Sequence, residues 1–260
     1  MPEFSGAVAL VTGAGRGLGA AICEKLAEYG ATVVATDASV DGARGTRDRI
    51  VGSGGSAHAF GLDVTSLEQA LSVVGDVEES VGPIQILVNN AGVSSFAPFL
   101  TLSEAEFDRI FAVNVKGVFN LCKATVPRMV ERKGGRVINM ASVVGKLGEA
   151  NIAHYASSKF AVVGFTQSLA VEMAQYGITF NSVCPGVVDT PLWTDLYRDA
   201  VAADMGSTEK EVRDWVLGHI PLHRTQPPED VAEMVAFLAS DLGRNMTGGS
   251  YHVDGGMVPR

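Results

Sequence analysis

Short apolar runs alternate along the whole chain with longer segments whose apolar residues recur at helical spacing. These strand-like runs are brief, and the first of them, at 7–11, is a continuous apolar run, which is typical of a strand buried on both faces of a parallel sheet. They lie at 7–11, 31–36, 56–60, 84–88, 136–140, 179–183 and near 250–253. Helical patterns lie between them at 18–29, 41–52, 66–81, 103–131, 153–176 and 228–241. Strands joined by helical crossovers form a parallel sheet, so we expect one α/β domain over 1–260, doubly wound, with helices on both faces.

Two helix starts and one long insertion are also marked in the sequence. Ser103 and Glu106 have the spacing of a capping box, and Pro227-Pro228 precede acidic residues at the start of a later helix. Residues 190–226 lie between the sixth and seventh strands, are partly helical and hold both tryptophans. A long segment at this place is often a lid over a site, so we favour a helical substrate lid over a peripheral pair of helices.

The composition excludes several classes of protein. With 47% hydrophobic and 19% charged residues, the chain of 260 residues has enough apolar material for a sizeable core. A net charge of −9 without a long basic run argues against nucleic acid or an anionic membrane as partner and leaves a small-molecule substrate. Cys23, Cys122 and Cys184 show no metal-binding spacing, and the chain has no leader pattern and no apolar run of membrane-spanning length. We expect buried free thiols, no metal site and a cytoplasmic protein.

A glycine-rich loop follows the first apolar run and opens the first helix. Its spacing, G-x-x-x-G-x-G from Gly13 to Gly19, differs from the common dinucleotide-binding pattern, but its place between a strand and a helix suits a pyrophosphate. Asp37 ends the second strand, where a carboxylate accepts hydrogen bonds from adenosine ribose hydroxyls and repels a 2′-phosphate. We therefore expect NAD rather than NADP. Two alternatives are open, because Arg16 could reach a 2′-phosphate and Asp37 could simply cap the next helix.

Tyr155 and Lys159 are four positions apart in a stretch of small and apolar residues. In a helix, both side chains point from the same face. Neither is a base at neutral pH by itself, since their ordinary pKa values are about 10 and about 10.4. A pair on an exposed helix face is the alternative. The nucleotide-binding pattern upstream and Ser142 at a strand end favour a catalytic pair instead.

Taken together, these motifs resemble the short-chain dehydrogenase/reductase family over nearly the whole chain. The motifs occur in the order Thr12 to Gly19; Asp63-Val64; Asn89-Asn90-Ala91-Gly92; Asn114; Ser142; Tyr155-x-x-x-Lys159; and Pro185-Gly186 followed by Thr190. The resemblance implies a Rossmann-type fold and a homotetramer. Residues 139–142 and 148–150 are similar to NAD-dependent polyol dehydrogenases of the sorbitol type. Residues 157–162 and 184–193 are similar to acetoin reductases and butanediol dehydrogenases.

The resemblance also implies roles for individual residues. Tyr155 would transfer the proton, and Lys159 together with the oxidised nicotinamide would lower the pKa of its phenol. Ser142 would hold the substrate oxygen, and Asn114 would hold a water that links Lys159 to solvent. Asn89 and Asn90 could instead be purely structural ties between strands. The residues expected to bind NAD are Gly13, Gly15, Arg16, Gly17, Leu18, Gly19, Asp37, Asp63, Val64, Asn90, Ala91, Gly92, Tyr155, Lys159, Pro185, Gly186, Val188 and Thr190.

The substrate that the resemblance implies is a small vicinal diol or polyol, or the matching ketone. Glu149 and Asn151 would bind its additional hydroxyl groups, or else form a surface turn, and Trp193 would close the pocket. Val143 and Val144 depart from these relatives, which often have a polar residue after the catalytic serine. A bulkier, less polar alcohol or ketone is therefore an alternative substrate.

Two further functions are alternatives. A reductase of 3-oxoacyl thioesters usually works with NADP, and Asp37 argues against that cofactor. A dinucleotide sensor without turnover belongs to another class of protein. Such sensors typically lack the tyrosine or the lysine, whereas this chain has Asn114, Ser142, Tyr155 and Lys159.

Overall fold

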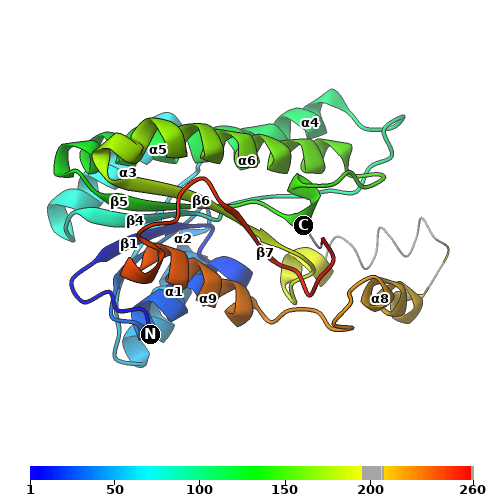
Figure 1. Ribbon diagram of the computed structural model, residues 1–260, viewed down its shortest axis with the longest axis horizontal. Helices are drawn as coiled ribbons and strands as arrows, with labels where there is room; N and C mark the ends of the chain where they lie inside the picture. Colours follow the sequence, from blue (N-terminus) through cyan, green and yellow to red (C-terminus); the bar gives the residue numbers. More distant parts are fainter. Residues whose placement is uncertain (195–205, 207, 259–260) are drawn as a thin grey trace.

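The computed structural model describes residues 1–194, 206 and 208–258 and contains one seven-stranded sheet (Figure 1). Neighbouring strands are parallel throughout and follow the order β3-β2-β1-β4-β5-β6-β7. The predicted strands are all present, and their ends differ from expectation by at most two residues. They are β1 (Val8–Thr12), β2 (Thr32–Asp37), β3 (Ser56–Gly61), β4 (Ile84–Asn89), β5 (Gly135–Met140), β6 (Ile178–Pro185) and β7 (Ser250–Val253).

Helices cover both faces of this sheet, as the alternating pattern predicts (Figure 1). One face packs against α1 (Gly17–Glu28), α2 (Val40–Gly52) and α9 (Pro228–Ala239) through a core that includes Ile22, Ile50 and Val235. The other face packs against α3 (Leu67–Ser80), α5 (Gly117–Arg132) and α6 (Ala153–Met173) through a core that includes Val74, Leu121 and Phe180. The central strands are apolar on both sides for this reason, and β1 and β6 are buried at every position.

The helical segment expected over 103–131 is interrupted by a wider turn. It divides into α4 (Glu104–Phe111), a π-helical turn (Ala112–Lys116) and α5. Single π-turns of this kind often occur at functional sites, and this one carries Asn114. Hydrophobic spacing did not reveal it, because one additional residue in a turn changes the helical period only locally.

The predicted capping box at the start of α4 is formed only in part. The Ser103 hydroxyl accepts a hydrogen bond from the Glu106 amide at 3.2 Å, as expected. The Glu106 carboxylate does not complete the box, because it accepts hydrogen bonds from Arg109 and Ser95 instead. The start of α9 agrees with the prediction: Pro228 opens this helix, with Glu229 in its first turn.

The insertion between β6 and β7 is described in part. It contains α8 (Glu209–Gly218), which opens with a capping box between Thr208 and Glu211. Residues 195–205 and 207 of the predicted lid lie outside the described residues. The three cysteines are free and buried, as predicted.

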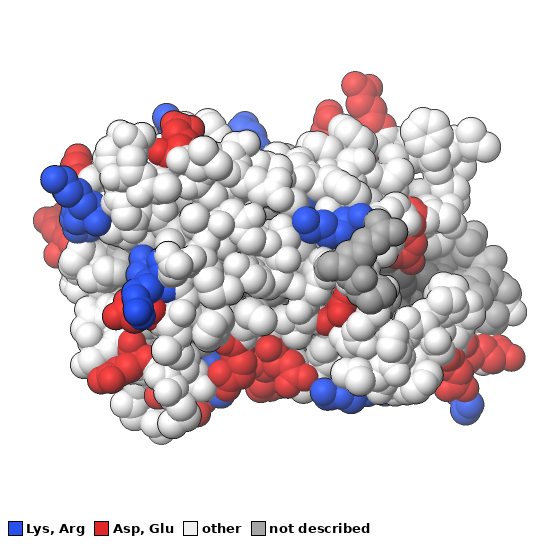
Figure 2. All heavy atoms as spheres, in the orientation of Figure 1, with Lys and Arg blue, Asp and Glu red and all other residues white. Residues whose placement is uncertain are grey.

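Charge is spread over the surface rather than concentrated. Figure 2 shows that, on the face in view, lysine and arginine side chains lie singly or beside acidic ones, without a continuous basic area. Within the described part of the chain, no helix is both long and apolar enough to cross a membrane.

The order of the strands fixes where a ligand can bind. Strands β1, β2 and β3 extend to one side of the sheet, and β4 to β7 extend to the other. The connections therefore diverge between β1 and β4, which leaves a crevice at the carboxyl ends of these two strands. The glycine-rich loop follows β1, and Asn90 follows β4, so both predicted motifs meet at this point.

Candidate active site

A cavity of about 660 Å³ lies at the carboxyl ends of the strands. The glycine-rich loop after β1 and the end of β2 line one part of it, and the segments after β5 and β6 line another. Most of the residues predicted to bind the cofactor are in its wall, namely Gly13, Arg16, Gly17, Leu18, Gly19, Asp37, Asp63, Val64, Asn90, Ala91, Gly92, Tyr155, Lys159, Pro185, Gly186, Val188 and Thr190. The fold therefore brings together residues that are far apart in the sequence.

The glycine-rich loop leaves no room for a side chain at Gly13 or Gly19. A Cβ atom at Gly13 would lie 2.7 Å from the Ala91 Cα, and the φ angle of Gly13 is +62°. A Cβ at Gly19 would lie 2.1 Å from the Gly13 carbonyl oxygen. Helix α1 begins at Gly17, and no side chain caps it. The amides of its first turn can therefore bind an anion, so the loop fits the pyrophosphate of a dinucleotide.

Asp37 lies at the end of β2, where its carboxylate is held by two main-chain amides. Its Oδ2 accepts a hydrogen bond from the Gly15 amide at 2.9 Å, and its Oδ1 accepts one from the Ser39 amide at 2.9 Å. Gly15 itself is not among the described residues that line the cavity. A Cβ at Gly15 would lie 2.9 Å from the Asp37 carboxylate, so Gly15 contributes by fixing that group. The carboxylate can accept bonds from a ribose at this end of the cavity.

Asn89 and Asn90 are structural ties, which was one of the two roles considered for them. The Asn90 amide group donates to the main-chain oxygens of Thr12 at 2.9 Å and Gly13 at 3.1 Å. Asn89 donates to the side-chain oxygen of Asn139 on the neighbouring strand at 2.8 Å. These bonds hold β4 against the glycine-rich loop on one side and against β5 on the other. The main chain at 90–92 reaches the cavity as a result.

Ser142, Tyr155 and Lys159 share one wall of the cavity. Ser142 follows β5, and its hydroxyl is close enough to the Tyr155 phenol to lower the pKa of that phenol. Tyr155 and Lys159 lie one turn apart in α6, as their spacing predicts, and the Lys159 ammonium is 5.7 Å from the centre of the Tyr155 ring. The ammonium donates a hydrogen bond to the Met140 carbonyl at 2.8 Å. Lys159 is buried and Tyr155 is half-buried, so the two residues do not form an exposed pair on the helix surface.

Burial changes the acidity of both groups in the protein without cofactor. It lowers the pKa of Lys159 to about 8, because the ammonium is removed from water. It also raises the pKa of Tyr155 to about 12, and the Ser142 hydroxyl only partly opposes this. The lowered phenol pKa that we expected is thus absent from the protein alone. The lysine is directed at the Met140 carbonyl, and the positive charge of an oxidised nicotinamide is a separate contribution.

Asn114 connects the loop after β4 to the catalytic helix. Its side chain accepts a hydrogen bond from the Val93 amide at 2.8 Å and donates to the Val93 carbonyl at 2.9 Å. It also donates to the Ser158 hydroxyl at 3.0 Å. The observed role of Asn114 is therefore to join the cavity wall to α6 beside Lys159, and its holding of a water remains a prediction.

Of the three residues predicted to bind substrate, two line the cavity and one does not. Glu149 and Trp193 line the cavity, and burial raises the pKa of the Glu149 carboxyl. Asn151 is not among the described lining residues. Its main chain is left-handed, with a φ of +63°, and its carbonyl accepts a hydrogen bond from the Ala97 amide at 2.8 Å.

Several lining residues were not identified from the sequence. Trp215 and His219 on and after α8 line the cavity, with ring centres 4.2 Å apart. Met257 reaches the same cavity from the segment after β7. The amphipathic pattern of α8 indicated a helix but not what it packs against, and no sequence pattern indicated that Met257 lines the cavity. Within the described residues, no group of three or more His, Cys, Asp or Glu side chains could hold a metal ion.

Comparison with known proteins agrees with this site. The family model described as short chain dehydrogenase matches residues 7–200. The chain belongs to this family. It is 39% identical over 255 residues to the 3-oxoacyl-[acyl-carrier-protein] reductase FabG of Vibrio cholerae, covering 98% of each chain. It is 40% identical over 257 residues to the oxidoreductase UcpA of Salmonella typhimurium, covering 98% of this chain and 96% of UcpA. These relatives are not polyol or acetoin dehydrogenases, so the two branches proposed from local motifs are not supported specifically.

Solved structures of the same fold also match nearly the whole chain. A gluconate 5-dehydrogenase from Burkholderia cenocepacia in complex with NADP and tartrate superposes with a TM-score of 0.91 at 32% identity, over 99% of this chain and 97% of that one. A structure described as a putative short-chain alcohol dehydrogenase from Sinorhizobium meliloti also gives a TM-score of 0.91, at 34% identity over 98% and 97% of the two chains. The chain is therefore a short-chain oxidoreductase built on a nicotinamide dinucleotide-binding fold.

Proposed function

We propose that this protein interconverts a secondary alcohol and a ketone with NAD(H), and that Tyr155 is its general acid and base. The observation that carries the proposal is the arrangement of the cavity. Ser142, Tyr155 and Lys159 lie in one wall of the same cavity that the glycine-rich loop and Asp37 line elsewhere. A sensor without turnover would not need a hydroxyl, a phenol and an ammonium together in such a wall.

The side chains suggest how the proton moves. In the reducing direction, the Ser142 hydroxyl and the Tyr155 phenol hold the ketone oxygen, and Tyr155 donates its proton to that oxygen. A bound reduced nicotinamide supplies the hydride. Lys159 is buried close enough to stabilise the phenolate that is left. In the oxidising direction, Tyr155 takes the proton from the alcohol.

The charge at the end of β2 supports NAD as cofactor. The Asp37 carboxylate is fixed by Gly15 and Ser39, and a 2′-phosphate beside it would be repelled. NADP is the competing cofactor, because Arg16 also lines the cavity and the Burkholderia neighbour was solved with NADP. We favour NAD because the carboxylate is held in place on both of its oxygens.

The lining of the cavity supports a bulkier, less polar substrate than a polyol. Val143 and Val144 follow Ser142 in the wall, and Trp193, Trp215 and Met257 are also present there. Apart from the indole N–H groups of the two tryptophans, these side chains offer no strong partners for a row of hydroxyl groups. The small diol or polyol suggested by local motifs is therefore the weaker candidate. A 3-oxoacyl thioester is the second candidate, favoured by the 39% identity to FabG.

A substrate panel tests the proposal. Purified protein is mixed with NADH or NADPH and with 2-octanone, ethyl acetoacetate, acetoacetyl-CoA or acetoin, and the loss of nicotinamide absorbance is followed. Sorbitol and 2,3-butanediol are tested with NAD and NADP in the opposite direction. We expect NADH-linked reduction of 2-octanone or ethyl acetoacetate. Rates confined to acetoacetyl-CoA would favour the thioester reductase, and NADH binding without any turnover would favour a sensor.

We also propose that the protein assembles into a homotetramer. Phe107, Phe119 and Phe160 are exposed on α4, α5 and α6, respectively. Exposed phenylalanines on neighbouring helices are typical of a surface that is covered in an assembly. Light scattering of the purified protein measures its mass directly, and a monomer would contradict this proposal.

A further inference from the structure

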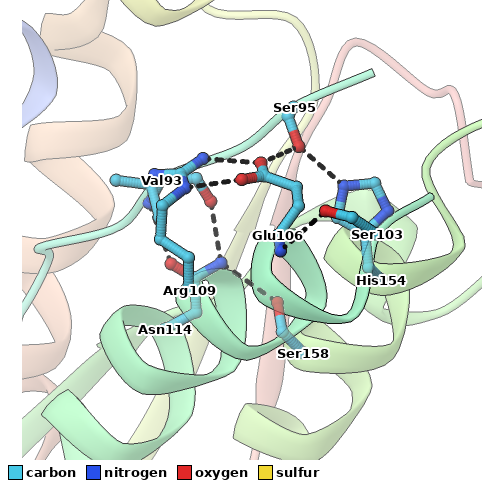
Figure 3. A network of polar contacts seen from close by, with 8 residues as sticks. All are labelled: Val93, Ser95, Ser103, Glu106, Arg109, Asn114, His154 and Ser158. Carbon is cyan, nitrogen blue, oxygen red and sulfur yellow. Dashed lines mark hydrogen bonds and ion pairs between the residues drawn. The ribbon is translucent and has the colours of Figure 1, made fainter. Parts of the chain in front are cut away.

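Three polar side chains, Ser95, Glu106 and His154, form a cluster next to the cavity but are not among the residues that line it (Figure 3). The Ser95 hydroxyl is hydrogen-bonded to the Glu106 carboxylate and, at 2.8 Å, to Nε2 of His154. Glu106 is held in turn by Arg109 through two bonds of 2.8 Å each. His154 is completely buried. It is the second residue of α6 and immediately precedes Tyr155.

Counting donors and acceptors fixes the proton on His154. Arg109 holds the pKa of Glu106 down at about 2, so this carboxylate is ionised and can only accept. The Ser95 hydroxyl must therefore donate its single hydrogen to Glu106. Nε2 of His154 must then donate to the Ser95 oxygen, which defines the neutral tautomer with its hydrogen on Nε2.

The other nitrogen of His154 explains why the ring stays neutral. Nδ1 is buried and has no hydrogen-bond partner among the described residues. A second proton would leave a buried N–H without an acceptor, and burial already lowers the pKa of His154. The charged groups that act on the ring are Glu106 and Arg109, both on α4, and their effects oppose each other.

The cluster fixes the cavity wall at two points. Ser95 lies in the loop after β4, where Gly92, Val93 and Ser94 line the cavity. Asn114 holds this loop at Val93, and the cluster holds it two residues later. Both ties end on α6, at Ser158 beside Lys159 and at His154 beside Tyr155. Figure 3 shows the two ties between α4, the loop and α6.

We propose that Glu106, Ser95 and neutral His154 form a positioning cluster that orients Tyr155 and the cavity wall at 92–95 for proton transfer. His154 does not touch the reacting atoms in this account. It acts through its Nε2 hydrogen, which anchors the first turn of α6 to the loop. The inference rests on the proposed function, because it assigns a purpose to the position of Tyr155.

Kinetics of matched variants test the cluster. His154→Phe keeps a ring of similar size but removes the hydrogen-bond donor. His154→Gln keeps a donor, because the nitrogen of the glutamine side chain is as many bonds from Cβ as Nε2 of histidine is. With the ketone that the wild-type protein reduces fastest, we expect His154→Phe and Ser95→Ala each to lower kcat by about 10- to 100-fold. We expect His154→Gln to restore kcat to within about threefold. The affinity for NADH should change little in all three, because the cluster is on the other side of the wall.

A control and a double variant separate positioning from general damage. Ser168→Ala removes an exposed hydroxyl from the same helix, where it contacts only the Gly164 carbonyl, and should leave kcat unchanged. The double variant His154→Phe/Ser95→Ala should be no slower than the slower single variant, since both break one cluster. Folded variants that keep kcat within twofold of wild type would overturn the proposal, as would a folded His154→Gln that is as slow as His154→Phe.

The tautomer can be measured without any substrate. Protein labelled with ¹⁵N-histidine contains five histidines, and the His154→Gln spectrum identifies the signals of His154. We expect a protonated Nε2 and an unprotonated Nδ1 from about pH 8 down to about pH 5, below the ordinary histidine pKa. A proton on Nδ1 in this range would overturn the cluster even if the wild-type protein reduced no ketone. Absence of turnover with the expected tautomer would instead contradict the proposed function and, with it, the catalytic purpose of the cluster.

Discussion

The choice between NAD and NADP depends on a single charge, that of Asp37. The most direct change is Asp37→Asn, which removes the charge and keeps an oxygen of nearly the same shape. In the structure the carboxylate accepts from the amides of Gly15 and Ser39 at 2.9 Å each. The asparagine oxygen can keep one of these bonds. The glycine-rich loop should therefore retain its conformation, and the effect should fall on the cofactor rather than on the fold.

The size of the effect follows from Coulomb's law. Two unit charges at about 4 Å repel by about 4 kcal/mol at an effective dielectric constant near 20, and by about 1 kcal/mol in bulk water. Asp37 is neither fully buried nor fully exposed, so a value of about 1 to 3 kcal/mol is appropriate for a 2′-phosphate beside it. A tenfold change corresponds to about 1.4 kcal/mol, so the preference for NADH over NADPH should fall by roughly 5- to 150-fold.

The assay compares kcat/KM for NADH and NADPH with one ketone, at low and at moderate salt. Asp41→Asn is the matched control, because it removes an equal charge from an exposed position near the start of α2 that does not line the cavity. We expect the ratio of the two cofactors to change in Asp37→Asn and to stay constant in Asp41→Asn. An unchanged ratio in Asp37→Asn would refute the role assigned to this carboxylate and would favour Arg16 as the group that decides the cofactor.

Two further predictions concern buried parts of the site. Between about pH 8 and its ordinary pKa of 10.5, Lys159 binds more protons in the unfolded than in the folded protein. Its contribution to the free energy of unfolding should therefore rise with pH by up to about 3 kcal/mol, while the buried cysteines and Tyr155, whose pKa values burial raises, contribute in the opposite direction. In urea unfolding, the free energy of the wild type minus that of Lys159→Met should rise over this range, and parallel pH dependences would contradict the lowered pKa. Gly19→Ala places a Cβ 2.1 Å from the Gly13 oxygen, so this variant should lose NADH binding measured by fluorescence. Gly75→Ala is the control, because Gly75 lies on α3 and a Cβ there would meet only the tip of Arg128, at 3.9 Å. This control should bind NADH normally, and its free energy of unfolding should rise by about 0.5–1 kcal/mol. Normal binding by Gly19→Ala would refute the fit of the loop.

The sheet could be predicted from the sequence because its signal is local and repeated. A continuous apolar run such as the one in β1 reports burial on both faces, and the helical segments between the runs require crossovers. The π-helical turn at Ala112–Lys116 could not be predicted in this way. It depends on the tie of Asn114 to Val93 and Ser158, and these residues are distant in the sequence.

The candidate site was predictable where a motif fixes the chemistry. Tyr155 and Lys159 lie one helical turn apart, and Asp37 lies at the end of a strand, so the positions of all three follow from local structure. The rest of the cavity depends on which segments meet in space. The sequence placed Trp215 only within a predicted lid, and nothing in it indicated that Met257 reaches the cavity. Burial raises the pKa of the Tyr155 phenol in the free protein. The lowering expected from the sequence includes the charge of an oxidised nicotinamide, so it stays a prediction for the complex.

The central claim is that Tyr155 transfers the proton in this cavity, and Tyr155→Phe tests it most directly. The change removes the hydroxyl group and keeps the ring, so packing against Val143 and Ile152 should remain. The measurement is NADH-linked reduction of the best ketone of the panel, with NADH affinity measured on the same sample. We predict a loss of at least about 100-fold in kcat, within the range that general acid catalysis contributes, and an NADH affinity close to that of the wild type. Turnover at the wild-type rate with intact NADH binding would contradict the account.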